Sequence, residues 1–225
     1  TAPQAWQGKP VSLVFEGVYQ TALVYLNGWL LTRNVNGYAE FTVEAGPYLK
    51  YGADNLLKVI ADNSLEPNSR WYTGSGIYRP VRLLMGNKVY LPQDTVRITT
   101  REVGEGFALL DVTAQVQSAS TVTERVTLQQ TICREGTAVL TDRQNLLLQP
   151  GESRTVSFRY CVDSPDLWSP ENPNLYTSTM QVLEGEEELD REETGFGIRT
   201  LSIDAAHGVR INGQTVKLRG ACIHH

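Results

Sequence analysis

Cysteine is scarce in this chain of 225 residues, and its placement excludes a disulfide-built scaffold. The three cysteines, Cys133, Cys161 and Cys222, lie far apart and are odd in number, so at most one bridge can form within the chain. Small disulfide-dense domains use more cysteines at shorter spacings. Hydrophobic cores must therefore stabilise the fold. The cysteine content does not indicate in which cellular compartment the protein resides.

Long apolar runs and clusters of basic residues are also missing. No apolar run approaches the roughly 18 to 20 residues that span a bilayer, which excludes a transmembrane helix. The formal net charge is -5, and the basic residues are scattered, whereas binding to phosphate backbones needs a clustered excess of Lys and Arg. We therefore expect neither a membrane nor a nucleic-acid partner.

The first residues, TAPQAWQGKPVSLVFEG, show no initiator Met and no basic or apolar region of a signal peptide. A processed or engineered start is expected. The protein is expected to be soluble. Its localisation stays open between the cytoplasm and, if a signal peptide was removed, the periplasm or the exterior.

No stretch predicts a long amphipathic helix; apolar and polar residues instead alternate in short runs. A period of two is typical of half-buried strands, so the sequence predicts an all-β fold. The alternating runs are Val11-Leu13-Phe15, Ala22-Val24-Leu26, Phe41-Val43, 108–116, 126–132 and 156–162.

Two Asn-Gly pairs mark tight turns. Asn27-Gly28 and Asn212-Gly213 separate strand-like runs, and both residue types accept the positive φ angles of a type I′ turn. The acidic run EGEEE, 184–188, is expected to be a solvated hairpin tip rather than a cation site. The more continuous apolar stretch LLKVIADN, 56–63, is expected at the centre of a sandwich.

The spacing of turn formers predicts three segments. Residues 1–88 form a first sandwich, and GNKVYLPQD, 86–94, holds the boundary. Residues 89–195 carry about seven short strands, the layout of an immunoglobulin-like sandwich, although the Cys-Trp-Cys spacing of true immunoglobulins is absent. Residues 196–225 contain a hairpin too short to bury its own core, so it must dock on what precedes it or belong to something further.

The end of the chain, RGACIHH, raises the question of a metal site. On an extended strand Cys222 and His224 point to one face and His225 to the other, so the three do not easily converge on one tetrahedral ion. A Cys-His nucleophile pair meets the same geometry and lacks an oxyanion-hole motif. No metal ligand is assigned from these residues.

The loop NSRWYTGSGIYRP, 68–80, is the better candidate for ligand binding. Arg70 and Trp71 combine planar donors with an aromatic face, a mix that suits a sugar. Alternatively, the aromatics close the end of the sandwich and the arginines pair with carboxylates. The second interpretation is favoured for Tyr78 and Arg79, and both stay open for Arg70 and Trp71.

Several stretches, in order, resemble the family 2 glycoside hydrolases, the group of β-galactosidases, β-glucuronidases and β-mannosidases. They cover nearly the whole chain, and SRWYTGSGIYR is most like the β-galactosidase branch. The stretches are FEGVYQTALVYLNGWLL, GYAEFTVE, NLLKVIADNS, SRWYTGSGIYRPVRL, DLWSPENPNLYTSTMQV and GFGIRTLSIDAAHGVRINGQTVKLRGACIHH.

The resemblance implies a fold for each segment. Residues 1–88 would be a jelly-roll-like, galactose-binding-type sandwich, incomplete at its start, and residues 89–195 an immunoglobulin-like sandwich. Residues 196–225 would be the hairpin and first strand with which a truncated (β/α)8 barrel begins. The chain is thus expected to be an amino-terminal fragment that lacks most of the barrel.

The resemblance also implies site residues. Active-site groups of such barrels project from the carboxyl ends of strands, which makes His224 a substrate-binding residue. Asn63, Arg70 and Trp71 would border the sugar. The two catalytic glutamates of a retaining mechanism would lie on later strands, and no glutamate here matches them. The fragment is therefore expected to be inactive, and its parent to hydrolyse terminal β-glycosides, β-galactosides above all.

The same resemblance bears on cofactors and partners. No cofactor is assigned to the fragment, whereas the parent is expected to use a divalent or monovalent cation. A carbohydrate of the β-galactoside type is the expected partner of the intact enzyme, and an open sheet edge allows a homo-oligomer. The alternative is a free-standing carbohydrate-binding or adhesion module. Such a module would not require the stretch GFGIRT through RGACIHH, with which a barrel would begin.

Apolar residues of the tail, including Val209, Leu218 and Ala221, are expected to be packed. Exposing one large aliphatic side chain forfeits about 1.5 to 3 kcal/mol, so several together approach the stability of a whole domain. The tail is therefore expected to lie against the second domain or a neighbouring molecule.

Overall fold

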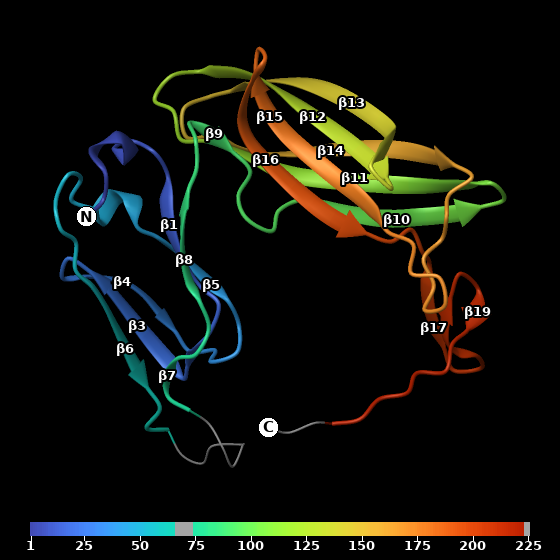
Figure 1. The fold of residues 1–225 in the computed structure, drawn as a ribbon, viewed down its shortest axis with the longest axis horizontal. Helices are drawn as coiled ribbons and strands as arrows, with labels where there is room; N and C mark the ends of the chain where they lie inside the picture. Colours follow the sequence, from blue (N-terminus) through green and yellow to red (C-terminus); the bar gives the residue numbers. More distant parts are fainter. Residues whose placement is uncertain (66–73, 223–225) are drawn as a thin grey trace. The chain divides into compact units, whose positions relative to one another are not determined.

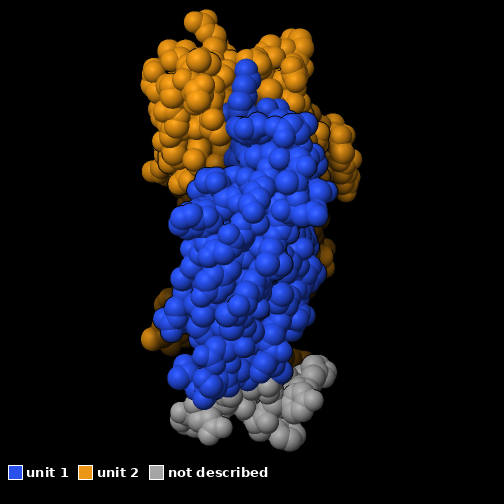
Figure 2. All heavy atoms as spheres, turned by 90° about the vertical axis from the view of Figure 1, so that its left-hand side faces the viewer, with its two compact units in different colours: residues 1–88 blue, residues 89–225 orange. Residues whose placement is uncertain are grey.

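The structure, a computed structural model, describes residues 1–65 and 74–222 (Figure 1). It divides into two compact units, Thr1–Lys88 and Val89–His225, which Figure 2 colours separately. Strands dominate both units, and the helical segments among the described residues are two short 3-10 turns, η1 (Gln4–Trp6) and η2 (Gly46–Tyr48). The predicted all-β fold is confirmed. Within 1–65 and 74–222, no helix is long and apolar enough to cross a membrane.

Two antiparallel three-stranded sheets build the first unit. One sheet has the order β5-β1-β8, and the other has the order β4-β3-β6. A short ladder also joins β2 to β7. The strands are β1 (Val11–Phe15), β2 (Val18–Tyr19), β3 (Thr21–Leu26), β4 (Trp29–Asn34), β5 (Phe41–Glu44), β6 (Leu57–Asp62), β7 (Gly76–Ile77) and β8 (Val81–Met85).

Alternating residues of β1 and β3 supply the core of the first unit. Leu13 and Phe15 from β1 cluster with Val24 and Leu26 from β3, and all four are buried. Phe41 stacks on Phe15 with ring centroids 5.0 Å apart. The residues predicted to face inward on β1 and β3 are all buried, and Val14 of β1 is buried as well.

The prediction that residues 56–63 form a central strand is wrong. β6 lies at an edge of its sheet, where its ladder partner among the described residues is β3. Its apolar run is continuous because Val59 packs against the core, while Ile60 lies opposite Leu23 in the ladder and stays 37% exposed. A continuous apolar run indicates that a strand has hydrophobic neighbours on both faces. It does not indicate how many strands are hydrogen-bonded to it.

The second unit is a sandwich of two antiparallel four-stranded sheets. One sheet has the order β10-β11-β14 with β9 beside β11, and the other has the order β13-β12-β15-β16 (Figure 1). The strands are β9 (Val89–Tyr90), β10 (Arg97–Gly104), β11 (Phe107–Ser118), β12 (Glu124–Arg134), β13 (Thr137–Leu148), β14 (Ser153–Asp163), β15 (Tyr176–Glu184) and β16 (Glu187–Phe196).

The inward residues of these strands form one continuous core, as the period of two predicts. Leu110 and Val112 of β11, Leu128 and Ile132 of β12, and Met180 of β15 are fully buried in it. The acidic run at 184–188 is the tip of the β15–β16 hairpin, where Glu184 pairs with Glu187. The expectation of a hairpin tip there is confirmed.

A small sheet follows the sandwich, with the order β17-β18-β19 from Leu201–Asp204, Gly208–Ile211 and Gln214–Thr215. The φ angles are 51° at Asn212 and 78° at Gly213, and 52° and 92° at Asn27 and Gly28. Both Asn-Gly pairs therefore adopt the conformations that a type I′ turn requires, as predicted.

Leu218 and Ala221 do not pack on the second unit, so that part of the expectation is wrong, while packing against a neighbouring molecule stays a prediction. The Val216 amide still donates to the Val209 carbonyl at 2.9 Å, but Leu218 is 70% exposed and Ala221 is also exposed. Residues 219–222 form no strand, because a strand needs a hydrogen-bonded neighbour and no described residue supplies one. That residues 196–225 begin a barrel stays a prediction.

Candidate functional site

The first candidate region lies where β6 ends, at Asn63. The Asn63 side chain donates a hydrogen bond from Nδ2 to Ser75 Oγ at 2.9 Å. This bond joins Asn63, which precedes the predicted sugar-binding loop 68–80, to Ser75, which lies within that loop. Asn63 is therefore placed to tie the loop to the end of β6, whatever it contacts besides.

A carboxylate precedes Asn63 and helps to shape the same turn. The backbone amide of Ser64 donates to Asp62 Oδ1 at 2.9 Å. Hydrogen bonds from the Ser64 side chain and amide, together with the positive charge of Arg33, hold the pKa of Asp62 below its ordinary value. Asp62 is consequently ionised at neutral pH and fixes the direction in which the chain leaves β6.

Tyrosine rings close this end of the first unit. Tyr78 donates from its hydroxyl to the Gly37 carbonyl at 2.8 Å, and its ring occupies the space that a Cβ on Gly17 would need. Tyr19 packs against Gly37 in the same way, with Tyr38 5.3 Å from it between ring centroids. This arrangement supports the interpretation that Tyr78 closes the sandwich end.

Three of the four predicted substrate-binding residues cannot be placed. Arg70 and Trp71 fall in 66–73, and His224 falls in 223–225, so all three lie outside the described residues. Arg79, which follows Tyr78, carries its guanidinium 5.9 Å from the centroid of the Tyr78 ring. The sugar-binding roles of Asn63, Arg70, Trp71 and His224 stay predictions.

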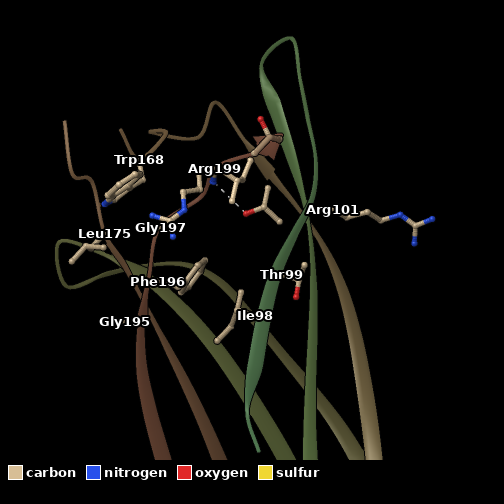
Figure 3. A pocket seen from close by; sticks show the side chains of 12 residues that line it. Ile98, Thr99, Arg101, Trp168, Leu175, Gly195, Phe196, Gly197 and Arg199 are labelled. Carbon is tan, nitrogen blue, oxygen red and sulfur yellow. Dashed lines mark hydrogen bonds between the residues drawn. The ribbon is translucent and has the colours of Figure 1, made fainter. Parts of the chain in front are cut away.

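A second region is a hollow of about 700 Å³ in the second unit, between β10, the end of β16 and the loop before β15. Figure 3 shows Phe196 and Ile98 directed toward one another at its base, and Arg101 pointing away from it. Trp168 and Leu175 lie along one side, next to Arg199.

Trp168 contacts two other residues that line this hollow, Arg199 and Gly197. The guanidinium of Arg199 sits 4.2 Å from the centroid of the indole, and Gly197 leaves no space for a Cβ, which would fall 2.7 Å from Trp168 atoms. Because Arg199 and Gly197 occupy the indole's surroundings, Trp168 is ill suited to stack on a sugar ring. The Arg199 amide also donates to Thr100 Oγ1 at 3.3 Å (Figure 3).

Asn212 joins the β18–β19 turn to the Trp168 loop. Its side chain donates from Nδ2 to the Trp168 carbonyl and accepts the Thr200 amide at Oδ1, each at 3.0 Å. Motif reasoning assigned no role to Trp168 or Arg199, and it assigned Asn212 only to a tight turn. The available signal was that all three lie in stretches that carry the family resemblance.

Potential metal ligands and thiols are dispersed. Within the described parts of the chain, no three His, Cys, Asp or Glu side chains form a group that could hold a metal ion. Cys133, Cys161 and Cys222 are all free thiols.

Comparison with known proteins relates this architecture to a family. Residues 89–199 match the family model for glycosyl hydrolases family 2. The β-galactosidase BoGH2A of Bacteroides ovatus is 36% identical over 219 residues, which cover 97% of this chain and 26% of that protein. The chain belongs to glycosyl hydrolases family 2. A putative β-glucuronidase of Formosa agariphila is 34% identical over 96% of the chain and 20% of its own length.

Solved structures of family 2 enzymes share the whole described fold. A family 2 member from Bacteroides cellulosilyticus has a TM-score of 0.91 at 32% identity, covering 100% of this chain and 31% of that one. A β-glucuronidase from Bacteroides uniformis has a TM-score of 0.92 at 30% identity, covering 100% and 28%. The chain therefore spans about a quarter of the length of the curated relatives it matches.

Proposed function

We propose that this chain is the non-catalytic β-sandwich part of a retaining glycosidase that removes terminal β-linked sugars, with β-galactosides as its substrates. The supporting observation is membership of glycosyl hydrolases family 2 across the shared fold, with a β-galactosidase among the relatives at 36% identity. Because the relatives are about four times longer, the two catalytic glutamates are assigned to a part of the protein outside residues 1–225. Any cation that the enzyme uses is assigned to that part too.

The residues of this chain then bind and orient substrate rather than cleave it. Asn63 holds the loop that carries Arg70 and Trp71, so that a planar donor and an aromatic face border the sugar. By the family resemblance, His224 is assigned as a further residue that contacts the sugar, where the barrel would begin. In a retaining enzyme two carboxyl groups about 5 Å apart act as nucleophile and as acid and base, and neither belongs to this set.

β-Glucuronides are the second candidate substrates. Several relatives and solved neighbours of similar identity are named β-glucuronidases, which is the observation that favours them. A glucuronide carries a carboxylate where a galactoside carries a hydroxymethyl group. Its recognition therefore requires a cationic side chain, which a galactoside does not need.

Hydrolysis of a panel of p-nitrophenyl β-glycosides by the full-length protein tests the proposal. We expect the galactoside to have the highest kcat/KM, with retention of anomeric configuration in the product followed by NMR. A preference for the glucuronide would transfer the assignment to the second candidate. Absence of hydrolysis of every β-glycoside would overturn the glycosidase assignment.

Two variants of the full-length enzyme separate binding from folding. Asn63→Ala is expected to raise KM, because the loop loses the bond that ties its Ser75 to the end of β6. Asn145→Ala is the matched control, since Asn145 lies on β13 of the second unit, where it accepts a hydrogen bond from Thr127. Equal KM values for the two variants would exclude a substrate-binding role for Asn63.

A further inference from the structure

The small sheet β17-β18-β19 separates apolar from polar residues between its two faces. Residues that lie opposite one another in a ladder point to the same face, and Leu201 lies opposite Ile211 while Ile203 lies opposite Val209. These four residues form what we call the apolar face. The residues of the other face are Ser202, Asp204, Gly208, Arg210 and Thr215.

The polar face has partners of its own within the sheet. Asp204 accepts the amides of Ala206 and His207 at 3.0 and 2.8 Å, and its other oxygen accepts Arg210 Nη2 at 2.8 Å. The bonds from His207, and then those from Ala206 and Arg210, hold the pKa of Asp204 below its ordinary value, so it stays ionised at neutral pH. An antiparallel sheet commonly presents one face to water and packs the other. The apolar face is therefore the one suited to packing.

The apolar face is not packed within the described part of the chain. Leu201 is 63% exposed and Ile203 is 71% exposed, while Val209 and Ile211 beside them are half-buried. A single exposed aliphatic residue is common on protein surfaces. Neighbouring ones on adjacent strands form a contiguous patch, and such patches mark interaction sites.

The sheet is attached to the second unit, which fixes the direction in which the apolar face points. The Asn212 amide donates to the Thr200 carbonyl, and Asn212 Nδ2 donates to the Trp168 carbonyl, each at 3.0 Å. Thr200 directly precedes β17. A surface that is held in this way loses less conformational freedom on docking than a free segment does.

The size of the apolar face favours one kind of occupant. Four residues on short strands are far fewer than the roughly 20 to 30 residues a side of a stable interface between separate proteins. The face is therefore too small to hold a second copy of the chain by itself. A part of the same polypeptide needs a smaller surface, because the covalent connection supplies a high effective concentration. The chain covers 26% of the β-galactosidase BoGH2A, so most of a protein of that length lies outside the matched part.

We propose that the apolar face is the docking surface for the catalytic part of the full-length protein, which contributes an apolar patch to the contact. The inference rests on the proposed function, which assigns both catalytic glutamates to that part. The contact would join the second unit to the catalytic part by side-chain packing, in addition to the chain connection.

Side-chain footprinting with hydroxyl radicals tests the contact directly. We expect Leu201 and Ile203 to react about fivefold more slowly in the full-length protein than in residues 1–225, since docking would bury side chains that are otherwise mostly exposed. Val122, which is 62% exposed in the second unit, is the matched control and should react at similar rates in both proteins. Circular dichroism verifies that both proteins are folded.

The double variant Leu201→Thr/Ile203→Thr gives an independent measurement. Threonine is β-branched and suits a strand, but it removes most of the apolar surface. We expect the melting temperature of the full-length protein to fall by about 5 °C and that of residues 1–225 to change by less than about 2 °C. Val139→Thr is the control, because Val139 is an exposed apolar residue of strand β13 and should have little effect in either protein.

The outcomes separate this inference from the proposed function. Equal labelling of Leu201 and Ile203 in both proteins would overturn the inference, and so would equal protection, which would place the cover within residues 1–225. Protection that disappears on dilution would also overturn it, because the occupant would then be a second copy. Each of these results leaves the glycosidase assignment intact if the full-length protein hydrolyses a β-glycoside. A full-length protein that hydrolyses none would overturn the assignment, and with it the catalytic nature of the docked part.

Discussion

The guanidinium of Arg199 lies 4.2 Å from the centroid of the Trp168 indole, and this pair connects the loop before β15 to the segment that leaves β16. The Trp168 amide donates to the Ile198 carbonyl directly beside it. A cation over an indole and a backbone hydrogen bond thus both join these two segments of the second unit. Its contribution to stability can be measured in the chain of residues 1–225.

Trp168→Ala is expected to lower the free energy of unfolding by roughly 2 to 3 kcal/mol, because it removes a half-buried aromatic ring and the partner of Arg199. Urea denaturation followed by far-ultraviolet circular dichroism measures the change. Trp29→Ala is the control, since Trp29 is 66% exposed and should lose little. Equal losses in the two variants would show that the Trp168 junction is not a stabilising contact.

Gly197→Ala is expected to destabilise the second unit by about 1 to 3 kcal/mol, because the new methyl group would lie 2.7 Å from Trp168. Gly195→Ala, two residues earlier, meets no atom within 4 Å and should be close to neutral. Thermal unfolding of both variants distinguishes a steric requirement from a general sensitivity of this segment. A neutral Gly197→Ala would disprove the close packing of the glycine against the indole.

Glu192→Gln is expected to raise stability at neutral pH. Burial, together with the negative charges of Asp94 and Asp190, raises the pKa of Glu192 above its ordinary value. The folded protein therefore holds this proton more tightly than the unfolded chain, and the free energy of unfolding falls as the pH rises above the ordinary Glu pKa. The variant should lose less stability between about pH 4.5 and pH 7.

Urea denaturation at several pH values between these limits measures the effect of Glu192→Gln. Glu186→Gln at the exposed hairpin tip controls for the loss of one negative charge. If both variants show the same pH dependence as the wild type, the partly buried position of Glu192 has no influence on folding.

Hydrogen exchange should divide the tail at Val216. The amides of Asn212 and Val216 donate to backbone carbonyls at 3.0 Å and 2.9 Å, so they are expected to exchange slowly. Residues 217–222 are exposed and belong to no strand, so their amides should exchange rapidly. Slow exchange at Leu218 would reveal a contact that this structure lacks.

Galactose titrated into residues 1–225 is expected to produce no measurable heat at millimolar concentrations. Under the proposed function most walls of the sugar pocket would lie outside residues 1–225, and the remaining contacts would be too few to bind a sugar. Isothermal calorimetry on this chain and on its Arg70→Ala variant makes the measurement. Binding that Arg70→Ala abolishes would favour the alternative of a free-standing carbohydrate-binding module.

Local features of the fold were predictable from short stretches of sequence. The turns at Asn27-Gly28 and Asn212-Gly213 follow from the φ angles that these residues tolerate. The buried faces of β1, β3, β11 and β14 follow from the period of two along each strand. These properties depend on neighbours within a few residues, which the sequence displays directly.

The sheet position of β6 was not predictable, because its apolar run looks the same at an edge as at a centre. The exposure of Leu218 was not predictable either. The hydrophobicity of a side chain favours burial, but it does not show whether a surface is available for the side chain to pack against. For the candidate site, Asn63 was named from the family resemblance. Its bond to Ser75 became visible only in three dimensions.

By itself, the sequence determined that this protein is all-β, that its strands alternate and where its tightest turns lie, because each of these depends on local conformational preference. Only the tertiary structure decided that Asn212 meets Trp168 across 44 residues and that Arg199 covers the indole. Such contacts form when separate segments pack together, and no pattern within either segment specifies its partner.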